Sequence, residues 1–531
     1  MSKGRILVVD DLPDWRTTLS GILLDGGYEV RAAGSREEAL RLLEAERFHL
    51  AVLDVRLDEA DEDNQEGLDL MRQIKVFDPT IRIIILTGYA NVRMVTDALR
   101  PQSDGLALAY SFIEKPNSQE LLTFIQSAFE HEIKINWNMV INSDNNFLHK
   151  LPARLRFTNQ SRPPASQLAA EIDELLRKLF FTCDKITIYP IKQGFSGAAV
   201  FRVKPYFHDR GQGESVVAKV GEWSLIEEEE RNFTQAVQGI VGGHRLPQRL
   251  ELARTRSLGG LIYSFAGLGD AISFVEFYTK TPPSDIIPVL KNLFLETCFP
   301  WGRSRKVFQP SFSFTDYYFS HLHLNPTKLQ HALSALFGQQ YCLSPIDDAS
   351  SQLRVGEYTL INPVDFVLHH PLVGETYLVP VHGDLTGYNI ILDHHHETWL
   401  IDFGRTGQGL LLQDFASLEN FVKISLLRTN DVLAFYNWES ELANIPTLQP
   451  SPRLLGLTLP DPFSKAHQVI LAVRQLAYQV SGDDYLKEYL ISLLFHALKL
   501  ITIMNLKPTQ RDLALVSASL TCQRLVGNFR T

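Results

Sequence analysis

The sequence predicts an α/β protein that begins with a doubly wound parallel sheet and continues into an α+β half with a helical end. Two observations favour this fold class. In the first 130 residues, short apolar runs alternate with amphipathic helical patterns, as expected of parallel strands joined by right-handed crossover helices. In the second half, strand-like segments precede three long helical patterns at 463–481, 485–504 and 510–526.

The first 130 residues contain four runs that we interpret as buried strands and four segments with a helical period. The expected strands are Arg5–Val9, His49–Leu53, Ile81–Leu86 and Tyr110–Ile113, and the expected helices are Trp15–Asp25, Ser35–Glu46, Gly67–Lys75 and Gln119–His131. In a parallel sheet of this kind the helices cover both faces. Residues that follow the strands therefore converge at one edge.

Polar residues follow each of the four strands at its carboxyl end. They are Asp10 with Asp11, then Asp54, then Thr87, and finally Lys115. Crowded carboxylates repel one another unless a hard divalent cation lies among them, and Mg²⁺ prefers oxygen ligands. A metal-neutralised aspartate can attack a phosphoryl group, while a lysine and a hydroxyl bind its oxygens. Each residue alone also fits a helix cap or a surface charge, but all of them in order favour phosphoryl chemistry.

These residues resemble the receiver domain of two-component response regulators, over residues 1–130. The resemblance implies a five-stranded parallel sheet, Asp54 as the phosphoacceptor, and a sensor histidine kinase as the partner that phosphorylates it. It also implies bound Mg²⁺, held by Asp54, by Asp11, by the backbone carbonyl of Arg56 and, partly through water, by Asp10.

The same resemblance assigns a signalling switch to two further residues. Thr87 is implied to be the switch hydroxyl, and Phe112, three residues before Lys115, the switch aromatic. Lys115 is implied to bind the phosphoryl oxygens as a point charge.

Composition narrows the classes of function. The 531 residues include 51 basic and 61 acidic side chains, a net charge of -10, which argues against the basic surface that sequence-independent nucleic-acid binding needs. The four cysteines lie far apart without a CxxC pair, so neither a zinc site nor a disulfide framework is indicated. No apolar run approaches the roughly 18 residues of a membrane helix. We expect a cytoplasmic protein that binds neither nucleic acid nor membranes.

Residues 131–165 are expected to be a linker, because the apolar pattern loosens after the last predicted helix. The segment 136–146 is rich in asparagine and 156–166 carries paired prolines, which is typical of connecting segments. A helical period follows at Gln167–Phe181. Two interpretations of this helix stay open: a linker helix or short coiled-coil contact, or, favoured of the two, a packing helix of the next domain.

The segment 186–220 has the pattern of a nucleotide-binding hairpin. Gly194, Ser196 and Gly197 lie between two strand-like runs, where small residues let backbone N–H groups approach phosphate oxygens. Lys219 then stands inside an apolar strand, and a buried lysine needs a partner or a ligand.

An acidic helical segment after this lysine offers a partner. The helix expected at Ile226–Val241 opens with four glutamates. Glu230 shares a face with the apolar residues of this helix, so we choose it as the partner of Lys219. Glu229 is the second choice. A solvated acidic first turn, favoured by the helix dipole, explains any single glutamate equally well.

The motif HGDLTGYN at 382–389, followed by DFG at 402–404, is the most specific feature of the second half. It supplies Asp384, Asn389 and Asp402. In phosphoryl transfer from ATP, one carboxylate orients or deprotonates the attacking hydroxyl. An amide and a second carboxylate hold Mg²⁺ on the ATP phosphates.

Together these motifs resemble the aminoglycoside-phosphotransferase and choline-kinase branch of the kinase-like fold, from about residue 180 to 450. The resemblance implies a bilobal kinase-like domain, with a nucleotide-binding N-lobe at 166–270 and a helical C-lobe at 271–531. It implies ATP and Mg²⁺ as ligands. The implied roles are Asp384 as base, Asn389 and Asp402 as metal ligands, Lys219 on the α/β-phosphates paired with Glu230, and Gly194, Ser196 and Gly197 at the nucleotide.

The sequence therefore predicts a response regulator with a kinase-like output domain. The leading hypothesis is an enzyme that transfers the γ-phosphoryl group of ATP to a small hydroxyl-bearing molecule, and the substrate itself is unidentified. The alternative is a nucleotide-binding scaffold of kinase shape without turnover. The presence of Lys219, Asp384, Asn389 and Asp402 together favours the enzyme.

Overall fold

The computed structural model describes residues 3–58, 64–88, 99–100, 107–157, 161–190, 197–237, 248–264, 271–298, 300–301, 306–337, 343–345, 352–449 and 451–529. The chain divides into two compact units. The first comprises Met1–Ile191, Ser196–Ile226 and Arg249–Tyr263, and the second comprises Lys192–Phe195, Glu227–Gln248 and Ser264–Thr531. Among the described residues, no helix combines the length and the apolar character needed to cross a membrane.

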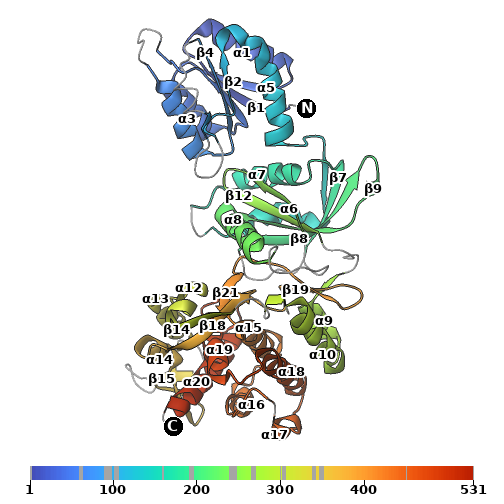
Figure 1. The fold of residues 1–531 in the computed structure, drawn as a ribbon, viewed down its shortest axis with the longest axis vertical. Helices are drawn as coiled ribbons and strands as arrows, with labels where there is room; N and C mark the ends of the chain where they lie inside the picture. The colour runs from blue at the N-terminus through green and yellow to red at the C-terminus, as the bar shows by residue number, and fades with distance from the viewer. Residues whose placement is uncertain are drawn as a thin grey trace. The chain divides into compact units, whose positions relative to one another are not determined.

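A five-stranded parallel sheet forms the N-terminal part of the first unit, drawn in blue in Figure 1. Its strands run in the order β2-β1-β3-β4-β5 and all pair in parallel. They are β1 (Arg5–Val9), β2 (Glu29–Ala33), β3 (Leu50–Leu53), β4 (Arg82–Thr87) and β5 (Ser111–Glu114). The parallel sheet expected from the sequence is confirmed.

Helices cover both faces of this sheet. They are α1 (Pro13–Asp25), α2 (Arg36–Ala45), α3 (Glu66–Phe77) and α5 (Leu121–Ser127). Buried residues of α2 and α3 share one core with alternate strand residues, and buried residues of α1 and α5 share a second core with the others. The period-two alternation of the strands therefore fills both cores.

Strand β2 was missed in the sequence. It lies at an edge of the sheet, and its side chains alternate between exposed and partly buried positions up to the buried Ala33. An edge strand has one neighbour and one solvated side, so it lacks the continuous apolar run that marks the central strands.

The second sheet of the first unit has seven strands, in the order β11-β12-β10-β8-β7-β6 with β9 paired to β8. The strands are β6 (Val140–Ser143), β7 (Lys185–Pro190), β8 (Ala199–Phe207), β9 (Gly211–Gln212), β10 (Val216–Glu222), β11 (Gln248–Arg254) and β12 (Leu258–Ser264). Helix α7 (Ala165–Leu179) buries its apolar face in the same core as β7, β8 and β10. This packing supports the second interpretation of that helix.

The segment expected to be a linker contains regular structure. Strand β6 pairs in parallel with β7, and α6 (Phe147–Arg154) adds Phe147 and Leu151 to the core of the second sheet. Because a four-residue strand and an eight-residue helix carry few apolar residues, the apolar periodicity between residues 131 and 165 is weak. The domain boundaries stay predictions.

The second unit combines three small sheets with helices. Its strands are β13 (Ile272–Ser273), β14 (Val307–Ser313), β15 (Leu343–Pro345), β16 (Gln352–Val355), β17 (Tyr358–Ile361), β18 (Val373–Val381), β19 (Ile390–Leu392), β20 (Thr398–Leu400) and β21 (Gly407–Leu410). The sheets have the orders β13-β19-β20, β14-β18-β21 and β15-β16-β17. Helix α8 (Trp223–Asn232) crosses the boundary between the units.

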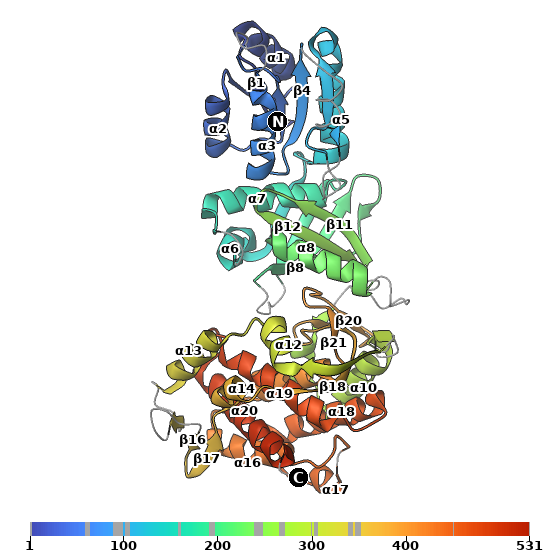
Figure 2. The same cartoon turned by 60° about the vertical axis from the view of Figure 1, so that its left-hand side comes forward.

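The helices of the second unit are α9 (Phe274–Lys280), α10 (Pro283–Asn292), α12 (Phe314–His321), α13 (Pro326–Phe337), α14 (Pro363–His369), α15 (Gln413–Phe421), α16 (Val432–Ala443), α17 (Pro452–Leu455), α18 (Phe463–Ser481), α19 (Leu486–Ile501) and α20 (Pro508–Phe529). Helix α19 packs against α20, as Figure 2 shows, and it also packs against α15. The last three helices match the three patterns expected near the end of the chain. The bilobal kinase-like arrangement stays a prediction.

A buried network of charges joins three of these helices. Both carboxylate oxygens of Glu419 in α15 accept hydrogen bonds from Arg474 in α18, at 2.8 and 2.6 Å. Tyr489 in α19 donates to the same carboxylate at 2.6 Å, and Lys423 lies 2.5 Å from it. All four side chains are buried. Because each charge has a partner, the network is compatible with a dry helical core.

Candidate functional site

Residues directly after β1 and β3 form a carboxylate cluster at the carboxyl edge of the parallel sheet. Carboxylate oxygens of Asp10, Asp11 and Asp54 lie within 4.8 Å of one another. Asp10 and Asp54 are buried, and Asp11 is half-buried. A hard divalent cation takes oxygen ligands at this kind of spacing, so the donor set fits the Mg²⁺ expected from the sequence.

Lys115, directly after β5, lies between two of these carboxylates. Its Nζ is 2.8 Å from Oδ2 of Asp10 and 2.6 Å from Oδ2 of Asp54. Burial disfavours the ammonium, but the two carboxylates outweigh burial and raise the pKa of Lys115. Burial raises the pKa of Asp10 in spite of the contact with Lys115. The lysine therefore stays charged between the two carboxylates.

The structure also describes three other residues named from the sequence. The backbone N–H of Arg56 donates to Oδ1 of Asp54 at 3.4 Å. Thr87 ends β4 and is fully buried, and Phe112 in β5 packs, partly buried, against the core under α2 and α3. The Arg56 carbonyl as a metal ligand, and Thr87 with Phe112 as a switch, stay predictions.

Gly67 brings the start of α3 against the backbone of Asp54. A Cβ atom at Gly67 would stand 1.8 Å from the carbonyl oxygen of Asp54. The N–H of Gly67 donates to the carbonyl of Val55 at 3.0 Å. Only a residue without a side chain allows this approach, so α3 and the loop after β3 are placed together. This role of Gly67 was not predicted from the sequence.

In the second unit, Asp414 braces the loop that carries the HGD motif. Its carboxylate accepts the backbone N–H groups of His382 at 2.8 Å and Gly383 at 2.9 Å. Gly383 has a φ of +80°, and a Cβ there would stand 2.2 Å from the carbonyl oxygen of Arg405. Burial raises the pKa of Asp414. The loop is thus held by a buried carboxyl group and by a position that requires glycine.

Asp384 and Asn389 meet within this loop. The side-chain amide of Asn389 donates to the backbone carbonyl of Asp384 at 2.8 Å. The backbone carbonyl of Asn389 accepts the N–H of Ile401 at 3.1 Å. This places Asp402, the residue after Ile401, beside Asn389. Asp402 has a φ of +69°, a conformation that residues other than glycine seldom adopt and that clusters at functional sites.

The carboxylate of Asp384 is partly accessible. Its side chain is 34% exposed, and Oδ1 lies 3.9 Å from Nη1 of Arg405. A partly exposed carboxylate can reach a hydroxyl group on a small molecule. The structure therefore brings together three residues named from the sequence, and their catalytic roles stay predictions.

Helix α8 holds the DFG segment through residues that sequence analysis ranked second or missed. Glu229 is buried, and its Oε1 accepts the N–H of Phe403 at 3.3 Å. Asn232 donates to the carbonyl of Gly404 at 3.0 Å. Glu230 is partly exposed and accepts the hydroxyl of Thr234 at 3.1 Å. The structure therefore favours Glu229 over our first choice, Glu230, as the buried glutamate of this helix.

The expected nucleotide-binding residues are described in part. Gly194 and Ser196 lie outside the described residues. Gly197 has a φ of +83°, and Lys219 is buried in β10, opposite Val200 of β8. Their roles at a nucleotide stay predictions.

Comparison with known proteins decides the nature of the N-terminal part. Residues 6–126 match the family described as response regulator receiver domain. This segment is a receiver domain. Residues 329–502, which include the HGD and DFG motifs, match the family described as Ternary complex associated domain 9.

Individual relatives match the receiver domain. The nitrogen assimilation regulatory protein NtrX of Azorhizobium caulinodans is 35% identical over 126 residues, or 24% of this chain and 26% of that protein. The alginate biosynthesis transcriptional regulatory protein AlgB of Pseudomonas aeruginosa is 38% identical over 120 residues, 23% of this chain and 24% of that protein. The chain thus spans about a quarter of the length of these curated relatives. A receiver domain protein from Methanospirillum hungatei, known as a crystal structure, is 32% identical, with a TM-score of 0.22, and covers 25% of this chain and 97% of that one.

Proposed function

We propose that the chain is a two-component response regulator of the cytoplasm that accepts a phosphoryl group on Asp54 from a sensor histidine kinase. An oxygen of Asp54 forms the bond to phosphorus, and the bond to the donor breaks. Lys115 supports this role, because its ammonium group lies within 2.8 Å of both Asp10 and Asp54 and can bind the phosphoryl oxygens. Mg²⁺ held by Asp10, Asp11 and Asp54 would neutralise the charge that accumulates there.

We further propose that the second half transfers the γ-phosphoryl group of ATP to a small hydroxyl-bearing molecule. The observation that carries this proposal is the braced loop in which Asn389 contacts Asp384 and adjoins Asp402. The acceptor hydroxyl would give its proton to Asp384 as its oxygen bonds to the γ-phosphorus, and ADP would leave. Asn389 and Asp402 would hold the Mg²⁺ that neutralises the phosphates.

A nucleotide-binding scaffold without turnover is the second candidate. It is favoured by the match of residues 329–502, which include the HGD and DFG motifs, to a family whose name refers to a ternary complex. Both candidates bind ATP, and only the enzyme turns it over.

A thermal melt of the full chain tests the shared part. Millimolar ATP with Mg²⁺ should stabilise the protein, by about 2.7 kcal/mol at a concentration 100 times Kd, because the ligand binds only the folded state. Asp402→Asn should remove the dependence of this stabilisation on Mg²⁺. A melt unchanged by ATP and Mg²⁺ would contradict both candidates.

Asp384→Asn separates the enzyme from the scaffold. It should keep the stabilisation by ATP and lose formation of ADP in the presence of a cell extract, since it removes the base and leaves the expected metal ligands. If the parent forms no ADP above the level of Asp384→Asn, the scaffold replaces the enzyme.

A further inference from the structure

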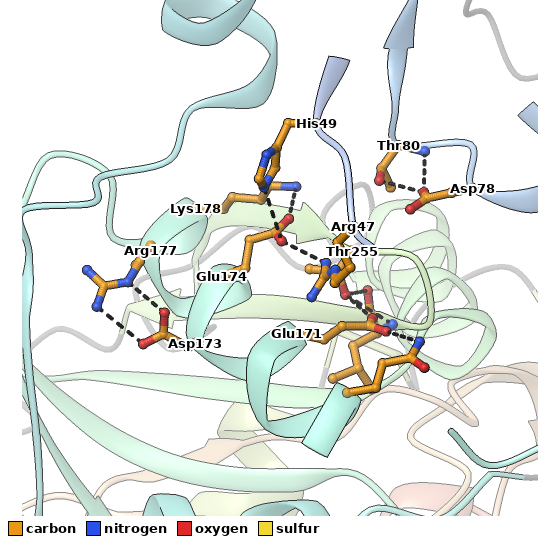
Figure 3. Close-up of polar contacts among 12 residues, drawn as sticks. Arg47, His49, Asp78, Thr80, Glu171, Asp173, Glu174, Arg177, Lys178 and Thr255 are labelled. Carbon is orange, nitrogen blue, oxygen red and sulfur yellow. Dashed lines mark hydrogen bonds and ion pairs between the residues drawn. The ribbon is translucent and has the colours of Figure 1, made fainter. Parts of the chain in front are cut away.

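One buried carboxylate joins the receiver domain to helix α7, as Figure 3 shows. Oε2 of Glu174 in α7 lies 2.7 Å from Nη2 of Arg47 and 3.6 Å from Nε2 of His49, both just before β3. Its Oε1 lies 2.8 Å from Nζ of Lys178, one turn further along α7. The side chain of Glu174 is 7% exposed. The carboxylate of Glu174 thus contacts three basic side chains, two from the receiver domain and one from α7.

Electrostatics keep this contact charged. Burial by itself would favour the protonated form of Glu174, but Lys178, His49 and Arg47 outweigh it and hold its pKa well below the ordinary value. A buried charge that loses its partners is costly. The receiver and α7 therefore favour staying together at this point.

Strand β3 connects this contact to the phosphoacceptor. His49 is fixed at its start, since its Nδ1 accepts the N–H of Arg5 at 3.0 Å and its own N–H donates to the Arg5 carbonyl at 2.9 Å. Its ring also lies edge-on to Trp137, 5.4 Å between centroids. Asp54 follows the other end of the same strand, about 17 Å away at about 3.3 Å per residue.

Helix α3 makes a second connection from the phosphoacceptor. It begins with Gly67 against the carbonyl oxygen of Asp54. It ends at Phe77, whose ring centroid lies 3.6 Å from Cζ of Arg256. Arg256 belongs to the turn between β11 and β12 of the second sheet.

This turn is itself fixed to α7. Thr255 donates its hydroxyl to Oε2 of Glu171 at 2.7 Å, and the N–H of Ser257 donates to the same oxygen at 2.8 Å. Glu171 is fully buried and lies one turn before Glu174. Both routes from Asp54 therefore end on one helix.

We propose that the receiver domain signals through the amino-terminal edge of its sheet, and that Glu174 carries a change at Asp54 into α7 and the second sheet. Strand β3 and helix α3 each have one end at Asp54 and the other at this edge. Movement of the loop after β3 therefore shifts His49 and Phe77 against their partners. The inference rests on the proposed phosphorylation of Asp54 and is independent of ATP turnover.

Hydrogen–deuterium exchange of the full chain tests this route, with Mg²⁺ and beryllofluoride as the phosphoryl mimic on Asp54. In the parent, the mimic should change exchange in residues 50–57 and also in α7, in α7 by about fivefold or more. Glu174→Gln should reduce the response of α7 to what the contact of Phe77 with Arg256 still transmits, and it should keep the response of 50–57. Asp173→Asn is the matched control, since Asp173 is 49% exposed and pairs with Arg177 on the same helix; it should respond as the parent.

Arg47→Gln breaks the same contact from the receiver side, where the side chain is 29% exposed, and it serves if Glu174→Gln does not fold. It too should reduce the response of α7. A response of α7 that is as large in both variants as in the parent overturns the proposal, as does a parent in which 50–57 respond and α7 does not. A parent in which 50–57 do not respond overturns the phosphoacceptor site, and the inference with it.

Discussion

Asp54→Asn is expected to reduce phosphorylation of the chain by acetyl phosphate to the background of a reaction without donor. Formation of an acyl phosphate needs a carboxylate oxygen as nucleophile, and the amide nitrogen of asparagine is not nucleophilic. The substitution also removes the charge that pairs with Lys115 at 2.6 Å. Acid-labile label on the protein measures the effect.

Removal of Mg²⁺ should have the same result in the parent. Three carboxylates within 4.8 Å oppose a further negative group unless a cation is present, so a chelator should abolish labelling. Asp14→Asn is the control, because Asp14 is an exposed acid in the first turn of α1; it should label as the parent. Labelling of Asp54→Asn at the parent rate would place the phosphoacceptor elsewhere.

Glu419→Gln is expected to lower the free energy of unfolding by about 3–5 kcal/mol. The substitution leaves the buried guanidinium of Arg474 without its carboxylate partner, and the cost of an uncompensated buried charge exceeds that of a lost surface pair. Denaturation of the full chain by urea measures the change, with the helix content followed by circular dichroism. Glu276→Gln is the control, because its ion pair with Lys280 is exposed and such pairs contribute about 0–1 kcal/mol. Equal losses in the two variants would contradict this account of the helical core.

The same network sets a dependence of stability on pH. Burial alone would raise the pKa of Glu419, but Arg474 and Lys423 outweigh it and lower the pKa to about 2. The unfolded chain takes up a proton near the ordinary value of 4.5, while the folded chain does not. The stability from this group is therefore complete above pH 4.5 and is lost as the pH falls through about 2. Glu419→Gln should flatten this part of the profile.

The receiver site could be predicted from the sequence because its chemistry follows from strand order. Asp10, Asp54 and Lys115 each come directly after a buried strand, and parallel strands bring such residues to one edge. Edge strand β2 could not be predicted because its pattern is half polar. The role of Gly67 could not be predicted because it depends on a close backbone approach, which no periodicity in the sequence indicates.

Contacts between distant segments could not be predicted. Glu229 and Glu230 are neighbours in an acidic run, and only the packing of α8 against the DFG segment distinguishes them. The contact of Arg47 with Glu174 joins residues 127 positions apart, and neither stands out in its own segment. Helix α7 was recognised as a helix from its period, but Arg47 and His49, which meet it, lie in the receiver domain.

We propose, as the central claim, that phosphorylation of Asp54 changes the affinity for ATP of the proposed nucleotide-binding half of the chain. Titration of the full chain with ATP and Mg²⁺, with and without beryllofluoride, tests it most directly. The account predicts that the mimic changes the affinity for ATP by a factor of about 5–150, the usual range of coupling between sites, and that Asp54→Asn exposed to the same beryllofluoride shows no change. An affinity for ATP that is the same in the parent with and without the mimic would contradict it.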